Sequence, residues 1–214
     1  MSDGRPEGYL ASPAGGPGVL VLHAWWGLND TVKSLCDRLA AEGFAAFAPD
    51  LYHGKVADTI EGAEALCGAL SKGFAQAMTD IMSSVSFLKE HSSGTGLAVI
   101  GFSMGANYAL ELVSEAPDDV HSVVLFYGCG EGNFTNTKAS FLGHFAENDP
   151  YEEKRYIDGL EQSIRDAGRP VTFHHYPGVG HWFFEPDRTD AYNAEAADLA
   201  WNRTLDFLKS KENG

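Results

Sequence analysis

Short apolar segments alternate with longer segments of helical periodicity along the whole chain. The apolar segments are rich in Val, Ile, Phe and Ala and contain few polar positions. Continuous apolar runs of this length are typical of strands that are covered on both faces of a sheet. We therefore predict strands at Val19–His23, Phe44–Ala48, Leu97–Phe102, Ser122–Tyr127, Ser140–Ala146 and Val171–Tyr176.

The segments between these strands carry apolar residues three and four positions apart, which predicts amphipathic helices. Asn29 and Asp30 precede the first of these stripes and are suitable N-terminal capping residues. The predicted helices cover Val32–Leu39, Phe74–Leu88, Ala106–Glu115, Glu152–Ala167 and Ala197–Leu208.

This alternation predicts an α/β fold with a mostly parallel, twisted sheet and helices on both faces. No repeat, low-complexity tract or linker divides the chain, so we expect residues 1–214 to form a single domain. Residues 1–12 contain little apolar pattern and are expected to be a loosely ordered N-terminal lead-in.

Composition and charge limit the classes of function. Hydrophobic residues make up 44% of the 214 positions and charged residues 21%, an ordinary globular balance. The net charge is −15 and no Lys/Arg-rich run is present, which argues against nucleic acid and membrane partners. Cys36, Cys67 and Cys129 form neither a disulfide framework nor a zinc pattern, and the N-terminus lacks the apolar core of a signal peptide. We therefore expect a cytoplasmic protein.

The segment Gly101–Gly105 has the pattern G-x-S-x-G, with Ser103 at its centre. It follows a predicted strand and precedes a predicted helix, which is the setting that a nucleophile elbow requires. In such an elbow the serine hydroxyl stands above the sheet edge, at a helix N-terminus that favours negative charge. The alternative is a serine in an ordinary glycine-rich turn.

A serine nucleophile needs a general base and a carboxylate that orients the base. Among eight histidines, His181 is the best placed, because it lies in the loop between the last strand and the final helix. Asp149 follows the strand Ser140–Ala146 and is the preferred carboxylate, with Glu147 as its nearest rival. Asp149 could instead form only a turn or a helix cap. The order Ser, Asp, His is that of α/β-hydrolases.

Hydrolysis of an ester also requires N–H donors for the developing oxyanion. We assign this role to the backbone N–H groups of Met104, which follows the nucleophile, and of Trp25, in the loop after the first predicted strand. Aromatic residues near these loops indicate an apolar substrate pocket, although each could be ordinary packing. The predicted pocket residues are Trp25, Trp26, Trp182 and Phe183.

From about Gly18 to Leu208 the sequence resembles the dienelactone hydrolase family, a compact branch of the α/β-hydrolases. The resemblance rests on Val19–Asn29, Ala48–Tyr52, the elbow, Asp149, Gly180–His181 and the closing helix at Ala200–Leu208. It implies a catalytic triad of Ser103, Asp149 and His181, with oxyanion donors at Met104 and Trp25. It implies no cofactor and no metal.

The sequence departs from the family prototype at three positions. The prototype has a cysteine nucleophile where this chain has Ser103, and a glutamate in the first loop where this chain has Ala24. The prototype also binds its substrate's carboxylate with arginines, one of them four residues after the histidine. That position is Glu185 here, which we place in the substrate pocket, and Leu51–Gly96 contains no arginine.

These observations predict a serine-dependent carboxylic-ester hydrolase that acts on small neutral esters or lactones through an acyl-enzyme. A thioesterase or a dienelactone-type lactonase would use the same residues. A non-catalytic binding module with an α/β-hydrolase fold is the alternative from another class. We expect a monomer, with a dimer as the alternative.

Overall fold

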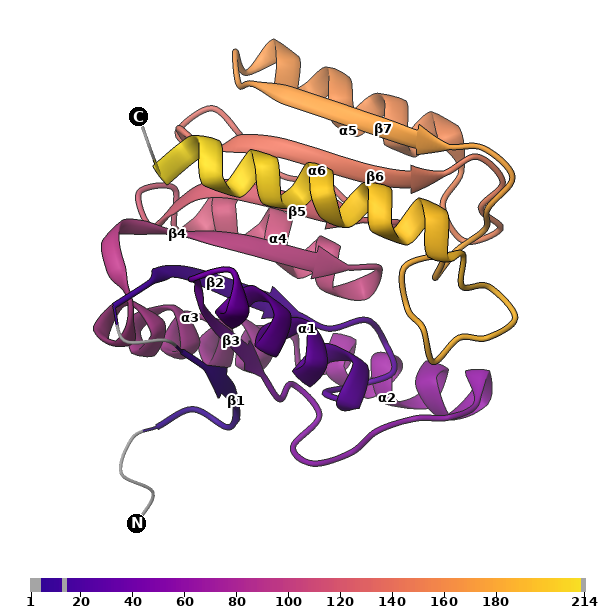
Figure 1. Ribbon diagram of the computed structural model, residues 1–214, viewed down its shortest axis with the longest axis horizontal. Helices are drawn as coiled ribbons and strands as arrows, with labels where there is room; N and C mark the ends of the chain where they lie inside the picture. The colour runs from indigo at the N-terminus through magenta and orange to yellow at the C-terminus, as the bar shows by residue number, and fades with distance from the viewer. Residues whose placement is uncertain (1–4, 13–14, 213–214) are drawn as a thin grey trace.

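The computed structural model describes residues 5–12 and 15–212, whose strands form one seven-stranded sheet (Figure 1). The strand order is β1-β3-β2-β4-β5-β6-β7, and every neighbouring pair is parallel except β1 with β3. The strands are β1 (Gly8–Ala11), β2 (Pro17–Leu22), β3 (Ala45–Pro49), β4 (Ser93–Phe102), β5 (Val120–Phe126), β6 (Ser140–Ala146) and β7 (Val171–Tyr176).

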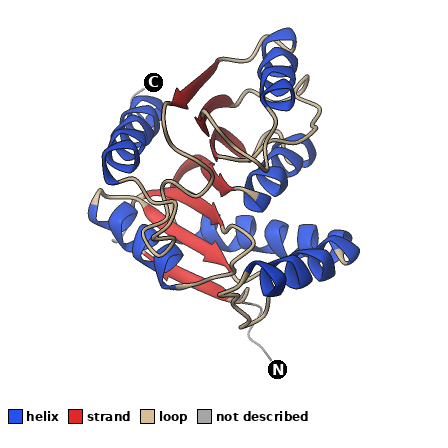
Figure 2. Cartoon of the chain, turned by 90° about the vertical axis from the view of Figure 1, so that its right-hand side faces the viewer, coloured by secondary structure: helices blue, strands red, loops and turns tan. Residues whose placement is uncertain are grey.

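Helices cover both faces of the sheet (Figures 1 and 2). Helices α1 and α6 pack on one face, and α3, α4 and α5 pack on the other. The helices are α1 (Asp30–Ala41), α2 (Ile60–Lys72), α3 (Phe74–His91), α4 (Met104–Glu115), α5 (Lys154–Asp166) and α6 (Ala194–Glu212). The predicted α/β architecture is confirmed.

The apolar runs become strands because the helices cover them from both sides. Strands β3 and β6 are buried along their entire length, which explains why β3 has no polar residue and β6 has only Ser140 and His144. The predicted limits of the strands at Ser140–Ala146 and Val171–Tyr176 agree with the structure, and those of the other four differ by one to four residues. The Asn29 side chain caps α1 by accepting a hydrogen bond from the Val32 amide at 3.1 Å, as predicted.

Two parts of the fold differ from the sequence-based expectation. Residues 8–11 are not a loose lead-in, because they form β1 and pair antiparallel with β3. Tyr9 packs against the core on one face of the sheet and Leu10 against the core on the other, so this edge strand is held on both sides. Residues 1–4 of the expected lead-in lie outside the described residues.

Helix α2 was not predicted, although its sequence carries an apolar stripe at Ile60, Ala63, Leu66, Cys67 and Leu70. Only Ala63 is buried in this helix, and Gly62 and Gly68 interrupt its pattern. The helix begins at a side-chain cap, since the Thr59 hydroxyl accepts a hydrogen bond from the Gly62 amide at 3.2 Å. It lies beside the ends of the strands, where it contributes to the candidate site (Figure 1).

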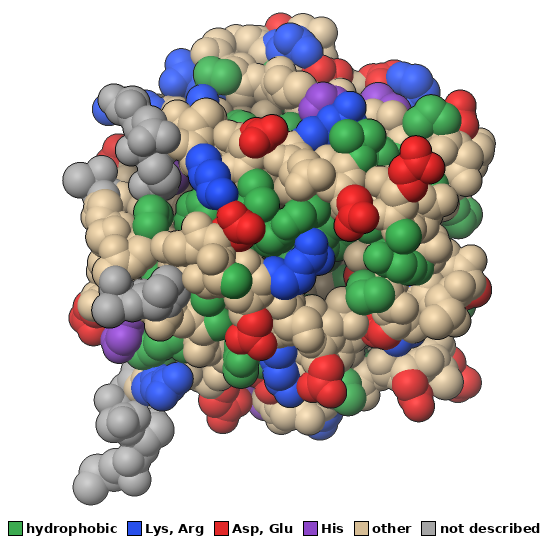
Figure 3. All heavy atoms as spheres, in the orientation of Figure 1, with side chains coloured by type: hydrophobic (Ala, Val, Ile, Leu, Met, Phe, Trp, Pro, Cys, Tyr) green, Lys and Arg blue, Asp and Glu red, His purple; other side chains and the backbone are tan. Residues whose placement is uncertain are grey.

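The surface carries charges of both signs. On the face that includes α1 and α6, acidic and basic side chains alternate with hydrophobic ones (Figure 3). Within the described residues, none of the helices has both the length and the apolar character needed to cross a membrane.

Candidate active site

Ser103 occupies the sharp turn between β4 and α4. Its backbone has φ 49° and ψ −114°, a conformation that a non-glycine residue adopts only when its surroundings impose it. The two glycines of the motif allow the close packing around this turn. A Cβ on Gly105 would lie 2.2 Å from the Leu22 carbonyl oxygen, and one on Gly101 would lie 2.5 Å from the Gly105 oxygen. The predicted strand–turn–helix setting is therefore present.

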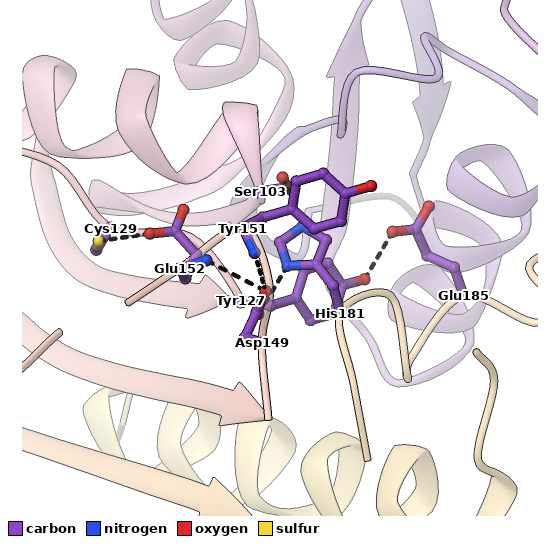
Figure 4. A network of polar contacts seen from close by, with 8 residues as sticks. All are labelled: Ser103, Tyr127, Cys129, Asp149, Tyr151, Glu152, His181 and Glu185. Atoms are coloured by element: carbon purple, nitrogen blue, oxygen red, sulfur yellow. Dashed lines mark hydrogen bonds and ion pairs between the residues drawn. The ribbon is translucent and has the colours of Figure 1, made fainter. Parts of the chain in front are cut away.

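Ser103, His181 and Asp149 form a chain of hydrogen bonds (Figure 4). The Ser103 Oγ lies 2.9 Å from His181 Nε2, and His181 Nδ1 lies 2.7 Å from Asp149 Oδ2. Since an ionised carboxylate only accepts hydrogen bonds, a neutral imidazole carries its proton on Nδ1 in this arrangement. The Nε2 atom is then free to accept the hydroxyl proton of Ser103.

Asp149 is held in place by the backbone that follows it. Its Oδ1 accepts hydrogen bonds from the amides of Tyr151 at 2.9 Å and Glu152 at 3.2 Å, which leaves Oδ2 for His181. Asp149 therefore fulfils both roles that the sequence left open: one oxygen stabilises the turn that follows it, and the other contacts His181. Glu147, the rival candidate, is exposed and accepts a hydrogen bond from the Gly178 amide at 3.1 Å.

A cavity of about 320 Å³ opens beside Ser103. None of the residues that line it carries a charge, and most of its wall is apolar or aromatic. Trp25, Ser103 and Met104 were predicted as site residues, whereas the residues from α2 and α3 and two further residues of α4 were missed. The lining residues are Trp25, Cys67, Ser71, Phe74, Ser103, Met104, Asn107 and Tyr108.

The rings of Tyr151 and Trp182 lie next to His181, and the ring of Trp25 packs against both of them. The ring of Trp25 stacks on Trp182 at 5.8 Å between centroids and meets Tyr151 edge-on at 5.6 Å. Tyr151 also lies 4.9 Å from the imidazole of His181, yet 47% of its surface remains exposed. Sequence reasoning missed Tyr151, although its position just after Asp149, at the carboxyl end of a predicted strand, was an available signal.

Four predicted pocket residues do not line this cavity. Trp182 is buried and stacks on Trp25, which does line it. Trp26 is buried beneath the guanidinium of Arg188, 4.1 Å from its ring centre. Phe183 is fully buried and packs on Tyr176. Glu185 is also buried and lines a separate cavity, so none of these four residues lines the cavity beside Ser103. Nearness to His181 in sequence was misleading, because the loop turns into the core directly after the histidine.

The predicted oxyanion donors are near Ser103. Met104 is the first residue of α4, so its amide N–H has no acceptor within the helix. Trp25 follows β2, and its side chain lines the cavity that contains Ser103. The roles of their backbone N–H groups stay predictions.

Cys129 lies on the loop that follows β5, and its thiol donates a hydrogen bond to Glu152 at 2.7 Å. Burial, together with the neighbouring Glu152 carboxylate, raises the pKa of this thiol well above its usual value. The protonated thiol is a poor nucleophile. This geometry therefore leaves the hydroxyl of Ser103 as the group that is paired with a base.

Residues 7–211 match the sequence profile of the Dienelactone hydrolase family. The chain belongs to the dienelactone hydrolase family. This membership confirms the resemblance seen in the sequence and supports an enzyme that hydrolyses esters or lactones.

Relatives of this dienelactone hydrolase family member align over nearly their full length. “Protein usf” of Aquifex pyrophilus is 35% identical over 215 residues, covering 96% of this chain and 93% of that protein. A “Putative carboxymethylenebutenolidase” of Aquifex aeolicus is 32% identical over 219 residues, covering 96% of this chain and 94% of that protein. The crystal structure of a “Putative Dienelactone Hydrolase” from Klebsiella pneumoniae is 23% identical, has a TM-score of 0.78 and covers 91% of this chain and 87% of that one. At that identity, the structural likeness supports the fold.

Proposed function

We propose that this protein is a serine-dependent carboxylic-ester hydrolase that acts on small neutral esters or lactones through an acyl-enzyme. The observation that carries the proposal is the hydrogen-bonded chain from Ser103 through His181 to Asp149, placed beside an uncharged cavity. A hydroxyl paired with an oriented imidazole is the arrangement that acyl transfer to serine needs.

In the first half of the reaction, Ser103 Oγ attacks the carbonyl carbon while His181 Nε2 takes the hydroxyl proton. The imidazolium that forms is stabilised by the Asp149 carboxylate, which accepts the hydrogen bond from Nδ1. The backbone N–H groups of Met104 and Trp25 donate to the oxyanion of the tetrahedral intermediate. His181 then gives its proton to the departing alcohol oxygen, which leaves an ester on Ser103.

In the second half, water replaces the alcohol. His181 accepts a proton from the water as its oxygen attacks the acyl carbon, and the proton is returned to Ser103 Oγ as the C–O bond breaks. The products are the carboxylic acid and the free serine. These reaction steps use only the residues named above and water.

The substrate class follows from the cavity wall. A carboxylate or phosphate on the substrate would lose its hydration in this cavity without gaining an ion pair, since no lining residue is cationic. The net charge of −15 adds a long-range repulsion of anions. Both effects favour neutral substrates. The name of the curated Aquifex aeolicus relative supports including lactones among them.

Neutral esters are therefore expected to be hydrolysed at least about tenfold faster, in kcat/KM, than matched anionic esters. The comparison uses p-nitrophenyl butyrate and p-nitrophenyl hemisuccinate, which have acyl chains of the same length. Adding salt should narrow the difference, because it screens the long-range repulsion. A neutral lactone and a thioester of equal acyl length complete the panel and distinguish esterase, lactonase and thioesterase activity. A preference for the hemisuccinate would contradict the proposed substrate class.

The nucleophile is tested by covalent labelling with a serine-directed fluorophosphonate. We expect a single adduct on Ser103, located by peptide mass spectrometry. The variant Ser103→Ala should remain unlabelled, whereas Ser86→Ala, which removes an exposed hydroxyl on α3, should label like the wild type. A folded wild-type protein that does not label would instead favour the non-catalytic binding module.

A further inference from the structure

Glu185 is a buried carboxyl group whose position the proposed reaction does not explain. The residue is 4% exposed, and its Oε1 accepts a hydrogen bond of 2.8 Å from the hydroxyl of Tyr127. It also lines a cavity of about 150 Å³ on the α1 side of the sheet, away from the cavity that contains Ser103. Burying a carboxyl group costs free energy of folding, and the hydrogen bond from Tyr127 offsets part of that cost. The presence of this buried pair beside the site therefore calls for an explanation.

Tyr127 connects this carboxyl group to the candidate active site. It directly follows β5 and is completely buried, and its ring lies 5.0 Å from the imidazole of His181 (Figure 4). Its backbone has φ 35°, and Trp182, next to the histidine, has φ 63°. Both are unfavourable for non-glycine residues and need surrounding contacts to hold them.

Glu185 and His181 belong to the same loop. The Glu185 amide donates a hydrogen bond of 3.0 Å to the Trp182 carbonyl, which closes a turn directly after the histidine. The Glu185–Tyr127 hydrogen bond therefore ties this turn to the end of β5, and the Tyr127 ring forms one side of the space that His181 occupies.

We propose that Glu185 is a positioning residue for His181, and that it acts through Tyr127. The hydrogen bond between them holds the histidine loop against the end of β5, so that the imidazole stays within reach of both Ser103 and Asp149. This inference rests on the proposed hydrolase function.

The groups around Glu185 make its effect dependent on pH. Its pKa is raised to about 8, mainly by burial and also by nearby Asp187, while Tyr127 and Arg188 act in the opposite direction. The carboxyl group is therefore mostly protonated at pH 7. Above pH 8 it becomes a carboxylate, which accepts the hydrogen bond from Tyr127 more strongly than the neutral carboxyl group does.

The charged groups near this carboxyl come from several elements. Arg38 of α1 lines the same cavity, and Arg188 of the histidine loop is paired with Asp187 at 2.8 Å. The Asp149 carboxylate, on the loop after β6, contributes to raising the pKa of Tyr127. Because the Tyr127 hydrogen bond favours the ionised form of Glu185, ionisation strengthens this contact, and kcat should rise as the pH rises through about 8.

The test compares three variants with p-nitrophenyl butyrate, with kcat corrected for the active fraction by phosphonate titration. Tyr127→Phe removes the donor and is expected to lower kcat by about 10- to 100-fold, since small misplacements of a base are costly. KM should change less than twofold, because Tyr127 does not line the substrate cavity. Tyr156→Phe, which removes an exposed hydroxyl on α5, is the control.

Glu185→Gln keeps an acceptor for Tyr127 but cannot ionise. It should retain kcat within threefold at pH 7 and lose the increase in kcat that the wild type shows as the pH rises through about 8. The same increase in Glu185→Gln as in the wild type would overturn the proposal, even if Tyr127→Phe failed to fold. A folded Tyr127→Phe with wild-type kcat would also overturn it. Neither result would affect the proposed function, which is tested separately through Ser103.

Discussion

Replacing Ser103 by alanine is expected to lower kcat/KM for a neutral aryl ester by about 10⁴- to 10⁶-fold. The hydroxyl is the atom that would form the acyl-enzyme, and no neighbouring group can replace it. Cys129 is held as a protonated thiol by Glu152. The activity that remains would be attack by water in a site that still has its N–H donors and His181.

The substitution should leave the fold unchanged. Alanine is smaller than serine, and it meets the same backbone constraint at φ 49°. Steady-state kinetics and circular dichroism of Ser103→Ala, with Ser86→Ala as control, provide the measurement. Hydrolysis within tenfold of the wild type by a well-folded Ser103→Ala protein would rule out the serine mechanism.

The sequence was sufficient to predict Ser103, His181 and Asp149 because each has a local signal and a fixed topological position. The glycine motif specified the turn, and apolar runs located the strands before Asp149 and His181. Parallel strands place their carboxyl ends at one edge of the sheet. Three loops far apart in sequence could therefore be expected to meet there, as the hydrogen bonds among the three residues confirm.

The walls of the cavity could not be predicted in the same way. They depend on where α2 lies, a helix with only Ala63 buried, and on which side of a loop each side chain faces. Trp182, Phe183 and Glu185 are near neighbours in sequence. Trp182 stacks on Trp25, whereas Phe183 lies in the core and Glu185 accepts a hydrogen bond from Tyr127.

The elbow motif predicts a strained backbone at Ser103, but nothing in the sequence indicated strain at Tyr127 or Trp182. Ser103, Tyr127 and Trp182 all adopt positive φ values, although none is a residue type that favours them. Ser103 is hydrogen-bonded to His181, while Tyr127 and Trp182 pack against the imidazole of His181. Such strain is tolerated where tertiary contacts impose it, so it marks this region as one where geometry takes precedence over local preference.

Asp149→Asn is expected to lower kcat by about 10³- to 10⁴-fold while the hydrogen-bonding shape of the site is largely kept. Asp149 Oδ1 accepts from two backbone amides, so the asparagine oxygen must take that position. Its NH₂ group then faces His181 Nδ1 and donates to it. The imidazole is forced to carry its proton on Nε2, where it can no longer accept the proton of Ser103. The opposite orientation of the amide would set the NH₂ group against the two backbone N–H donors.

The matched control is Glu147→Gln, two residues earlier. Glu147 is exposed and accepts a hydrogen bond from the Gly178 amide, a bond that glutamine can also accept. The kcat of the Glu147→Gln variant should stay within twofold of the wild-type value, measured with the same ester and the same correction for active sites. Equal losses in the two variants would mean that general surface charge, and not the tautomer of His181, controls the rate. A loss confined to Asp149→Asn, with KM unchanged, ties the rate to the proton on Nδ1, because the two substitutions remove the same charge and differ in their contact with the imidazole.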